Sequence, residues 1–280
     1  MNSLRLSLLG LLAGAASSSA VVLVDETFAD GNRSTQNPPA SLAWYLYGAT
    51  GYSSSVTANT WEITPATNTP FGAIGYFTAS GSPTALTVGQ TMTLSFNISY
   101  ATAVTGGAGN FRFALFDSGG TRISSDLTSS SDAAFNSDRG YASFYTLSTD
   151  SDVTNGYRLR ERTNDNDSLW TAGAFSTLGT NGDNNVATTN DVLYAATLTL
   201  EYVSPTQMTV TSNVNGNILS RTDSSPYTTF DSIAFSSNGT NGTVNLSNIE
   251  VTVVPEPGTC LLAGLGFGLL LWRRSRCMLS

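Results

Sequence analysis

Residues 91–100 read TMTLSFNISY, and this stretch decides the fold class. Apolar residues occupy every second position in it, from Met92 to Tyr100. This is the period of a β-strand with one buried face. Similar segments follow along the chain, at 111–116, 141–147, 157–162, 194–203, 207–214, 217–222, 230–235 and 243–254. Shorter strands are expected before it, at 21–28, 60–64 and 71–77.

Turn-forming residues separate these segments. The pair Asn215-Gly216 lies between two such runs and is typical of a two-residue hairpin. We find no amphipathic helix pattern and no repeat of fixed period in the sequence. The sequence therefore predicts an all-β fold, a two-sheet antiparallel sandwich of the jelly-roll type, in one domain over residues 21–253.

The wording of four segments supports this fold. They are VDETFADGNR (24–33), FRFALFDSGGTRI (111–123), YRLRERT (157–163) and SIAFSSNGTNGTVNLSNIEVTVV (232–254). Together they resemble the concanavalin-like, laminin-G-type jelly-roll domains of exported bacterial proteins. That fold is shared by lectins, glycosidases, lyases and inert spacers, so the resemblance implies an architecture and not an activity.

The composition excludes several classes of function. The chain has 280 residues and no His, and all 12 of its basic residues are Arg. Residues 21–254 hold 8 Arg and 19 acidic residues, so their formal net charge is 8 − 19 = −11. A nucleic-acid partner is not expected, because phosphate binding needs a basic surface.

The N-terminus is typical of a secretory signal peptide. Arg5 precedes an apolar run over 6–16, and Ser18 and Ala20 suit the small residues before a cleavage site. We expect cleavage after Ala20, which makes residues 1–20 the signal peptide. The alternative is a retained N-terminal anchor, for which the apolar run is short.

The C-terminus carries three elements in a fixed order. Val254, Pro255, Glu256 and Pro257 form a stretch that the prolines hold extended. An apolar run over 259–272 follows, shorter than a bilayer usually requires. A basic cluster then predicts a stop to transfer, with the end of the chain in the cytoplasm. Its members are Arg273, Arg274 and Arg276.

This order resembles the PEP-CTERM sorting signal, with the motif at 254–257, a transmembrane helix at 259–272 and a basic tail at 273–280. The resemblance implies recognition by an exosortase, a membrane transpeptidase, and processing near Pro255 to Pro257. It implies a precursor anchored in the inner membrane and then delivery to the cell surface, the outer membrane or the extracellular matrix. The only cysteines, Cys260 and Cys277, lie in this tail, so residues 21–253 have no disulfide.

Enzymatic chemistry in the exported domain would have to use carboxylates, because residues 21–253 contain no His, Cys or Lys. Glycosidases need two carboxyl groups close together. Glu161 and Asp165 are the nearest pair, but turn-forming residues separate them. No catalytic residue is therefore predicted.

Two segments are candidate binding sites. Asp165 and Asp167 lie in TNDNDSLW (163–170), which is either a solvated turn or a loop that binds Ca²⁺ through oxygens on alternate residues. Apart from this ion, no cofactor is expected. The residues Arg158, Arg160 and Arg162 alternate along YRLRER (157–162) and so share one face of a strand.

That arginine row either is a solvated outer face or binds the carboxylates or sulfates of an acidic polysaccharide. Trp170 is a candidate for stacking on a sugar ring; the other aromatic candidates are Trp44, Tyr45, Tyr47 and Trp61, which core packing explains equally. The resulting hypothesis is a non-enzymatic carbohydrate-binding module in or on an exopolysaccharide matrix. A glycan-processing enzyme that uses carboxylates and a purely structural spacer are the alternatives.

Overall fold

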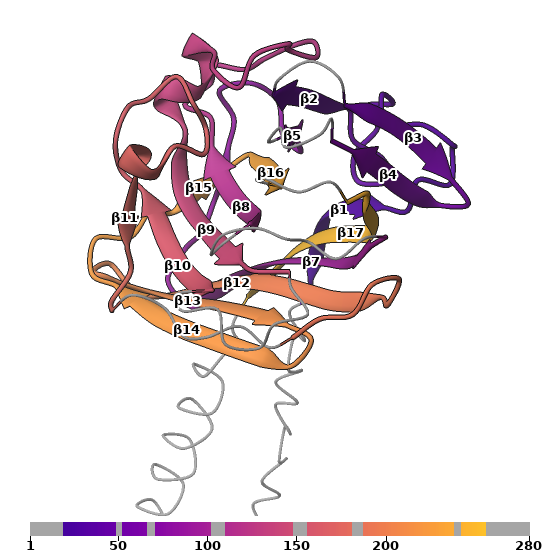
Figure 1. Ribbon diagram of the computed structural model, residues 1–280. Coiled ribbons are helices and arrows are strands. Elements are labelled where there is room, and N and C mark those ends of the chain that lie inside the picture. The colour runs from indigo at the N-terminus through magenta and orange to yellow at the C-terminus, as the bar shows by residue number, and fades with distance from the viewer. Residues whose placement is uncertain are drawn as a thin grey trace, which may run out of the picture.

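The computed structural model describes residues 19–48, 52–65, 71–101, 110–147, 156–180, 187–237 and 242–255. These residues form a sandwich of two large antiparallel sheets (Figure 1). The predicted all-β jelly-roll fold is therefore confirmed. The predicted signal peptide lies almost wholly, and the membrane helix and basic tail wholly, outside the described residues.

The first sheet has eight strands and contains the stretch that decided the fold class. Its order is β14-β13-β12-β7-β17-β4-β3, and β1 also pairs with β17. The strands are β1 (Val21–Glu26), β3 (Ser53–Thr57), β4 (Thr60–Thr64), β7 (Gln90–Tyr100), β12 (Tyr194–Ser204), β13 (Gln207–Val214), β14 (Asn217–Asp223) and β17 (Val244–Pro255).

The second sheet has seven strands in the order β11-β10-β9-β8-β16-β5-β2. They are β2 (Trp44–Gly48), β5 (Phe71–Tyr76), β8 (Phe111–Asp117), β9 (Arg139–Tyr145), β10 (Tyr157–Arg162), β11 (Phe175–Thr177) and β16 (Ser232–Ser237). Short elements complete the description: the ribbon β6 (Thr84–Ala85) with β15 (Thr229–Phe230), and the 3-10 turns η1 (Ala133–Ser137) and η2 (Ala172–Ala174).

Aromatic side chains fill the space between the two large sheets. Trp44 and Trp61 are buried there with ring centroids 5.3 Å apart, so these two candidates for sugar stacking belong to the core. Phe96 of β7 packs edge-on against Phe235 of β16 at 5.0 Å. Each fully buried large apolar side chain contributes roughly 1.5–3 kcal/mol to the free energy of folding.

The seven-stranded sheet is also buried on part of its outer face. Phe116 of β8 and Phe175 of β11 lie there, together with Phe135 and Leu169 from two long loops. The loop before β9 includes η1, which Asp132 caps by accepting a hydrogen bond from the Ala134 amide. The two loops cover one end of this face, and we call their residues 131–138 and 163–171 the roof.

The predicted hairpin at Asn215-Gly216 is confirmed. Val214 of β13 pairs with Asn217 of β14, and Asn215 and Gly216 adopt φ of +52° and +82°. Both positive values match the turn that joins two antiparallel strands without splaying them. In the part of the chain that the structure describes, no helix has the length and apolar character needed to cross a membrane.

Gly140 is a position where only glycine fits. It is the second residue of β9, with φ +142°, and a Cβ atom there would lie 2.3 Å from the Leu115 carbonyl oxygen on β8. We expect Gly140→Ala to lower the free energy of unfolding by about 2–4 kcal/mol, because the neighbour is backbone and must be displaced. Gly173→Ala is the matched control, since a Cβ at Gly173 meets nothing within 4 Å. Denaturant unfolding of both variants checks the expectation, and equal stabilities would contradict it.

Candidate ligand-binding face

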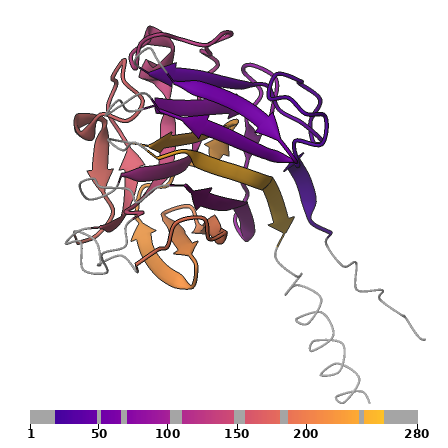
Figure 2. The same cartoon turned by 45° about the vertical axis from the view of Figure 1, so that its right-hand side comes forward.

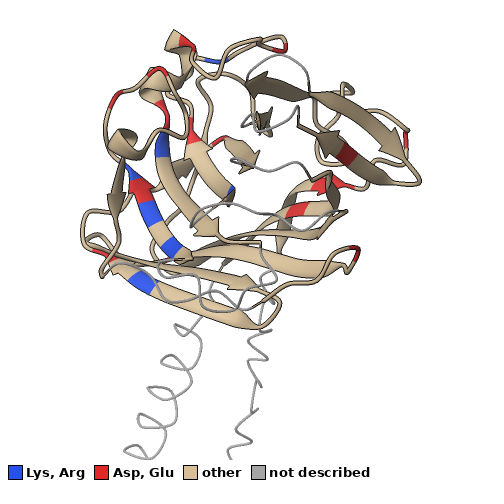
Figure 3. Cartoon of the chain, viewed as in Figure 1, with Lys and Arg blue, Asp and Glu red and all other residues tan. Residues whose placement is uncertain are grey.

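The outer face of the seven-stranded sheet carries a cluster of arginines. Arg158, Arg160 and Arg162 all point to this face, whereas Tyr157 and Leu159 point into the core between the sheets. The alternation in 157–162 thus predicts the sides of β10 correctly. Figure 3 shows the basic positions along β10, interrupted by one acidic position, with other basic positions scattered over the domain.

Arg112, on another strand of the sheet, lies close to Arg158 and Arg160. Arg112 of β8 stands opposite Phe144 of β9, and Phe144 stands opposite Arg158 of β10. The Phe144 ring is the centre of the group, with the guanidinium carbons of Arg112, Arg160 and Arg158 at 4.7, 5.1 and 5.8 Å from its centroid. Each distance is within the range of a cation–π contact. We call Arg112, Phe144, Arg158 and Arg160 the arginine cluster.

Burial lowers the pKa of each arginine of the cluster, and neighbouring arginines add to the effect on Arg112 and Arg158. Burial, followed by the charges of Arg158 and Arg160, lowers the pKa of Arg112 to about 10. Burial also lowers the pKa of Arg158 and of Arg160, and the charge of Arg160 adds to the effect on Arg158. All three remain cationic at neutral pH. A bound anion would relieve both the repulsion and the poor solvation, so this surface favours negatively charged ligands.

Arg160 is the member that is best placed to gain from such a ligand. It pairs with no carboxylate of the described residues, and its Nε is buried without a hydrogen-bond partner there. Its guanidinium is nevertheless only partly buried. The exposed part of the guanidinium is what an acceptor on a ligand could reach, and a charge-assisted hydrogen bond there would be favourable.

Trp170 forms a wall beside the cluster. Its carbonyl oxygen accepts a hydrogen bond from Arg112 Nη1 at 2.9 Å, and its ring Nε1–H donates to Tyr47 Oη at 2.6 Å. The Trp170 ring stacks on Phe175 with 5.9 Å between centroids and 11° between planes. Only 8% of Trp170 is exposed, so the side chain is held rather than free to adapt.

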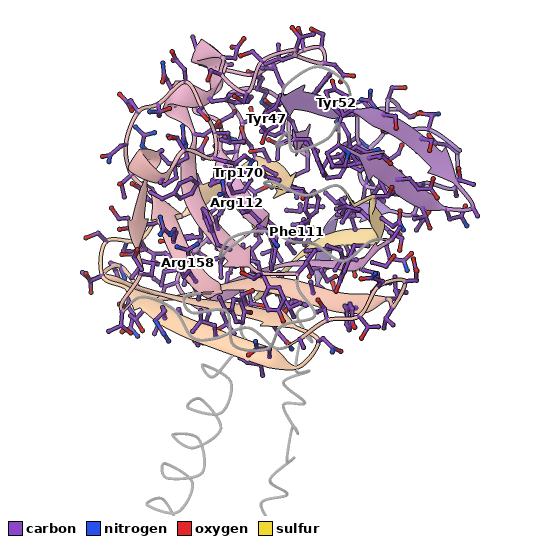
Figure 4. All side chains as sticks on the ribbon, viewed as in Figure 1. Tyr47, Tyr52, Phe111, Arg112, Arg158 and Trp170 are labelled. Carbon is purple, nitrogen blue, oxygen red and sulfur yellow. The ribbon has the colours of Figure 1, made fainter. Side chains whose placement is uncertain are left out.

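A cleft of about 330 Å³ opens next to this wall. Its residues include Tyr47, Gly72, Arg112, Trp170 and Ser236. Figure 4 shows Tyr47, Trp170 and Arg112 near one another, with Arg158 farther along the face. Gly72 has a structural role here: a Cβ at this position would lie 2.2 Å from the Tyr47 ring, so only glycine lets Tyr47 lie across β5.

Arg162 does not belong to a ligand-binding surface. It is 0% exposed, and its guanidinium donates to five backbone carbonyl oxygens at 2.7–3.3 Å. These carbonyls belong to both roof loops: Phe135, Asp138, Asn166, Ser168 and Leu169. The sequence placed Arg162 on the correct face of the strand, but the roof covers it. A ligand cannot reach it in this structure.

The two aspartates of the candidate calcium loop serve other contacts. The Asp165 carboxylate is ion-paired with Arg139 and is largely exposed. The main-chain carbonyl of Asp167 accepts the amide of Asp132 at 2.8 Å. Across the described ranges, no three His, Cys, Asp or Glu side chains gather as a metal site would require. Calcium binding by Asp165 and Asp167 stays a prediction, which this arrangement does not favour.

Glu161 lies beside a carboxylate that sequence spacing did not reveal. It points to the inner side of the sheet, away from the arginine cluster, and burial, followed by the charge of Asp223 on β14, raises the pKa of Glu161. Asp223 accepts a hydrogen bond from Tyr141 Oη at 2.5 Å. The interaction joins two different sheets, so no pattern within one strand could have shown it.

A buried acid lies under the roof. Asp138 is 1% exposed, and neither of its carboxylate oxygens has a hydrogen-bond partner. Burial raises the pKa of Asp138 well above its ordinary value, although the charge of Arg162 opposes the shift. The protonated form is therefore favoured in the folded protein.

Asp138→Asn should make the domain more stable at neutral and alkaline pH. Because the folded-state pKa is raised, the folded protein keeps a proton that the unfolded chain loses above about pH 4. The stabilisation by this group is complete below that pH and is lost as pH rises towards the folded-state pKa, by roughly 1.4 kcal/mol per pH unit. Asn does not lose a proton, so the variant should avoid this loss.

Thermal unfolding from about pH 5 to about pH 9 checks the expectation, because the difference in melting temperature between variant and wild type should grow with pH. Glu201→Gln is the control, since it neutralises an exposed carboxylate on β12. A difference that is constant with pH would show that Asp138 is not protonated in the folded state.

The comparisons with known proteins concern the tail and the architecture separately. A family model described as the PEP-CTERM protein-sorting motif matches residues 253–276. The chain thus carries a C-terminal sorting motif, which implies an exported protein that an exosortase processes. Of this match, residues 253–255 lie in β17, and the rest lie outside the described residues.

No curated protein matches the chain in sequence. Solved structures to which it is similar include the potassium-bound carbohydrate recognition domain of Emp46p, with 12% identity, a TM-score of 0.47, and coverage of 76% of this chain and 88% of that one. Peanut lectin with a 9mer peptide has 12% identity, a TM-score of 0.44, and coverage of 84% and 97%. The alginate lyase Aly36B has 11% identity, a TM-score of 0.42, and coverage of 84% and 97%.

Proposed function

We propose that the exported domain is a non-enzymatic module that binds an acidic polysaccharide on the outer face of its seven-stranded sheet. The observation that carries the proposal is the convergence of Arg112, Arg158 and Arg160 on the Phe144 ring. Three cations gathered at one place in a domain of net charge −11 repel one another, and a polyanion removes that repulsion.

A uronate or sulfate group fits the arginines better than a neutral sugar does. Guanidinium donors match a carboxylate or sulfate in geometry and form charge-assisted hydrogen bonds. The cleft beside Trp170 and Tyr47 adds a place for a sugar residue next to Arg112. Trp170 would act mainly as a rigid wall, because its ring already stacks on Phe175.

The domain would do this work in or on an exopolysaccharide matrix. The sorting motif at 253–276 supports delivery through an exosortase and a precursor anchored by residues 259–272. The final place, whether cell surface, outer membrane or matrix, is part of the proposal. A module that holds matrix polysaccharide needs only binding, and Glu161, the acid on β10 between Arg160 and Arg162, points to the inner side of the sheet.

Binding to polygalacturonate should depend on the arginine cluster. We expect Arg160→Ala to weaken the affinity about tenfold, because a hydrogen bond to a charged group contributes about 1.5–3 kcal/mol. Arg158→Ala should act in the same direction. Arg221→Ala is the control, since it removes the same charge from β14 in the other sheet. Calorimetric titration of residues 21–253 measures the affinities, and added salt should lower that of the wild type.

Equal affinity in Arg160→Ala and Arg221→Ala would contradict the site, and binding of a neutral glucan with equal strength would contradict the ligand class. Absence of binding to any glycan would favour a structural spacer. The same samples are to be assayed for reducing ends or unsaturated products.

The second candidate function, glycan processing by carboxylates, rests on Glu161 beside Asp223. Product that forms in the wild type and disappears in Glu161→Gln would favour it.

The mature protein should begin at Val21 and end near Pro257. The signal sequence predicts the first end, and the sorting motif predicts processing at 254–257 for the second. Mass spectrometry of the protein recovered from the cell surface measures both ends at once. An intact Met1, or an intact Ser280 on the surface form, would refute the corresponding cleavage.

A further inference from the structure

We infer that the end of the sandwich where β1 begins and β17 ends rests against the lipid bilayer while the chain is a membrane-anchored precursor. β1 and β17 are antiparallel neighbours, with Val21 opposite Val253. The place where the mature chain starts and the place where the sorting motif starts are therefore adjacent (Figure 2). The inference is independent of any glycan ligand and rests on the predicted membrane helix.

The connection between the folded domain and that helix is very short. β17 extends to Pro255, which pairs with Gln90 of β7, so the motif begins inside the sheet. The apolar run begins at Thr259, which leaves residues 256–258 as the connection. Three residues span about 10 Å at most. The end of the sandwich therefore has to lie at the level of the lipid headgroups.

Exposed valines gather at this end, among exposed polar residues such as Thr87 and Thr206. Five of the eight exposed large hydrophobic residues of the described chain lie there: Val21 at 54%, Val22 at 41%, Val88 at 53%, Val203 at 38% and Val254 at 39%. Pairing brings them together, because Val254 stands opposite Thr91 and the Gly89 amide donates to the Tyr202 carbonyl at 2.8 Å. We call these five residues the valine rim.

The segments that carry the valine rim have no charged residue. They are residues 19–24, 84–100, 202–212 and 251–255. Elsewhere the domain is acidic, and an acidic surface would be repelled by anionic headgroups. An exposed acid, Glu201, flanks these segments opposite Thr91, but the segments themselves are uncharged, so their exposed valines can bury apolar area in a bilayer. Because the connection to the membrane helix is short, the bilayer is the surface that we expect the valine rim to contact.

The experiment uses the full-length precursor in vesicles of phosphatidylethanolamine and phosphatidylglycerol. Cys260→Ser and Cys277→Ser remove the native thiols, and Val88→Cys or Val203→Cys then introduces a single fluorophore. Leu193→Cys and Ile218→Cys are matched controls, because Leu193 and Ile218 are 59% and 61% exposed but lie away from the rim. Leu193 precedes the first residue of β12, whereas Val203 is next to the last, about 30 Å along the strand.

Lipids with a spin label on the headgroup serve as the quencher. We expect quenching at positions 88 and 203 to be several times that at 193 and 218. Equal quenching at all four positions, or none at 88 and 203, would overturn the inference. The inference would also be overturned if the fluorophores at positions 88 and 203 were shielded from solvent in native inner membranes but not in pure lipid vesicles. A membrane protein, and not the bilayer, would then cover this end of the domain. Thermal unfolding of each labelled variant verifies that it is folded.

Discussion

The buried guanidinium of Arg162 is the interaction on which the outer face of the seven-stranded sheet depends. Its five hydrogen bonds reach carbonyls in residues 135–138 and 166–169, within two loops that the isolated bridge between Ser131 and Ser168 also joins. Buried carbonyls without donors would cost several kcal/mol together, and Arg is the side chain that can satisfy five of them at once. Asp138 lies within its field, and burial raises the pKa of this carboxyl although the charge of Arg162 opposes the shift, so the five carbonyl dipoles are the partners that Arg162 contacts directly.

The roof that Arg162 holds also shapes the candidate binding face. Trp170 follows directly after the carbonyls of Ser168 and Leu169, so the position of its ring depends on the same contacts. The row of three arginines on β10 is thereby divided. Arg162 lies under the roof and is structural, whereas Arg158 and Arg160 lie beyond it and surround Phe144 with Arg112. The alternating motif on β10 thus supplies Arg162, which holds the roof, and two of the three cations of the site; Arg112 comes from β8.

The sequence predicts the fold far better than it predicts the site, and the reason is physical. A period of two depends only on which side of a strand a residue occupies, so 91–100 and 157–162 could be assigned to strands and faces directly. What covers a face depends on loops that approach from elsewhere, which is why the burial of Arg162 was missed. Arg112 joins the cluster through the register of three strands, and Glu161 meets Asp223 across two sheets. The alternating FRFALF did carry a signal for Arg112, since it is the charged residue between two buried phenylalanines.

The arginine cluster and the valine rim differ in charge, and this difference suits the different roles that we propose for them. A net charge of −11 repels a polyanion at long range, so attraction by Arg112, Arg158 and Arg160 acts only within about one Debye length, ~8–10 Å at physiological ionic strength. Under the proposed function, an acidic glycan would therefore be held at the arginine cluster and not elsewhere on the surface. The proposed role of the valine rim is different, because its own segments hold no Arg and its five exposed valines offer apolar area, with Glu201 as a flanking acid. In the arrangement that we propose, the short connection holds the domain at the membrane until cleavage, so the apolar contact itself can be weak.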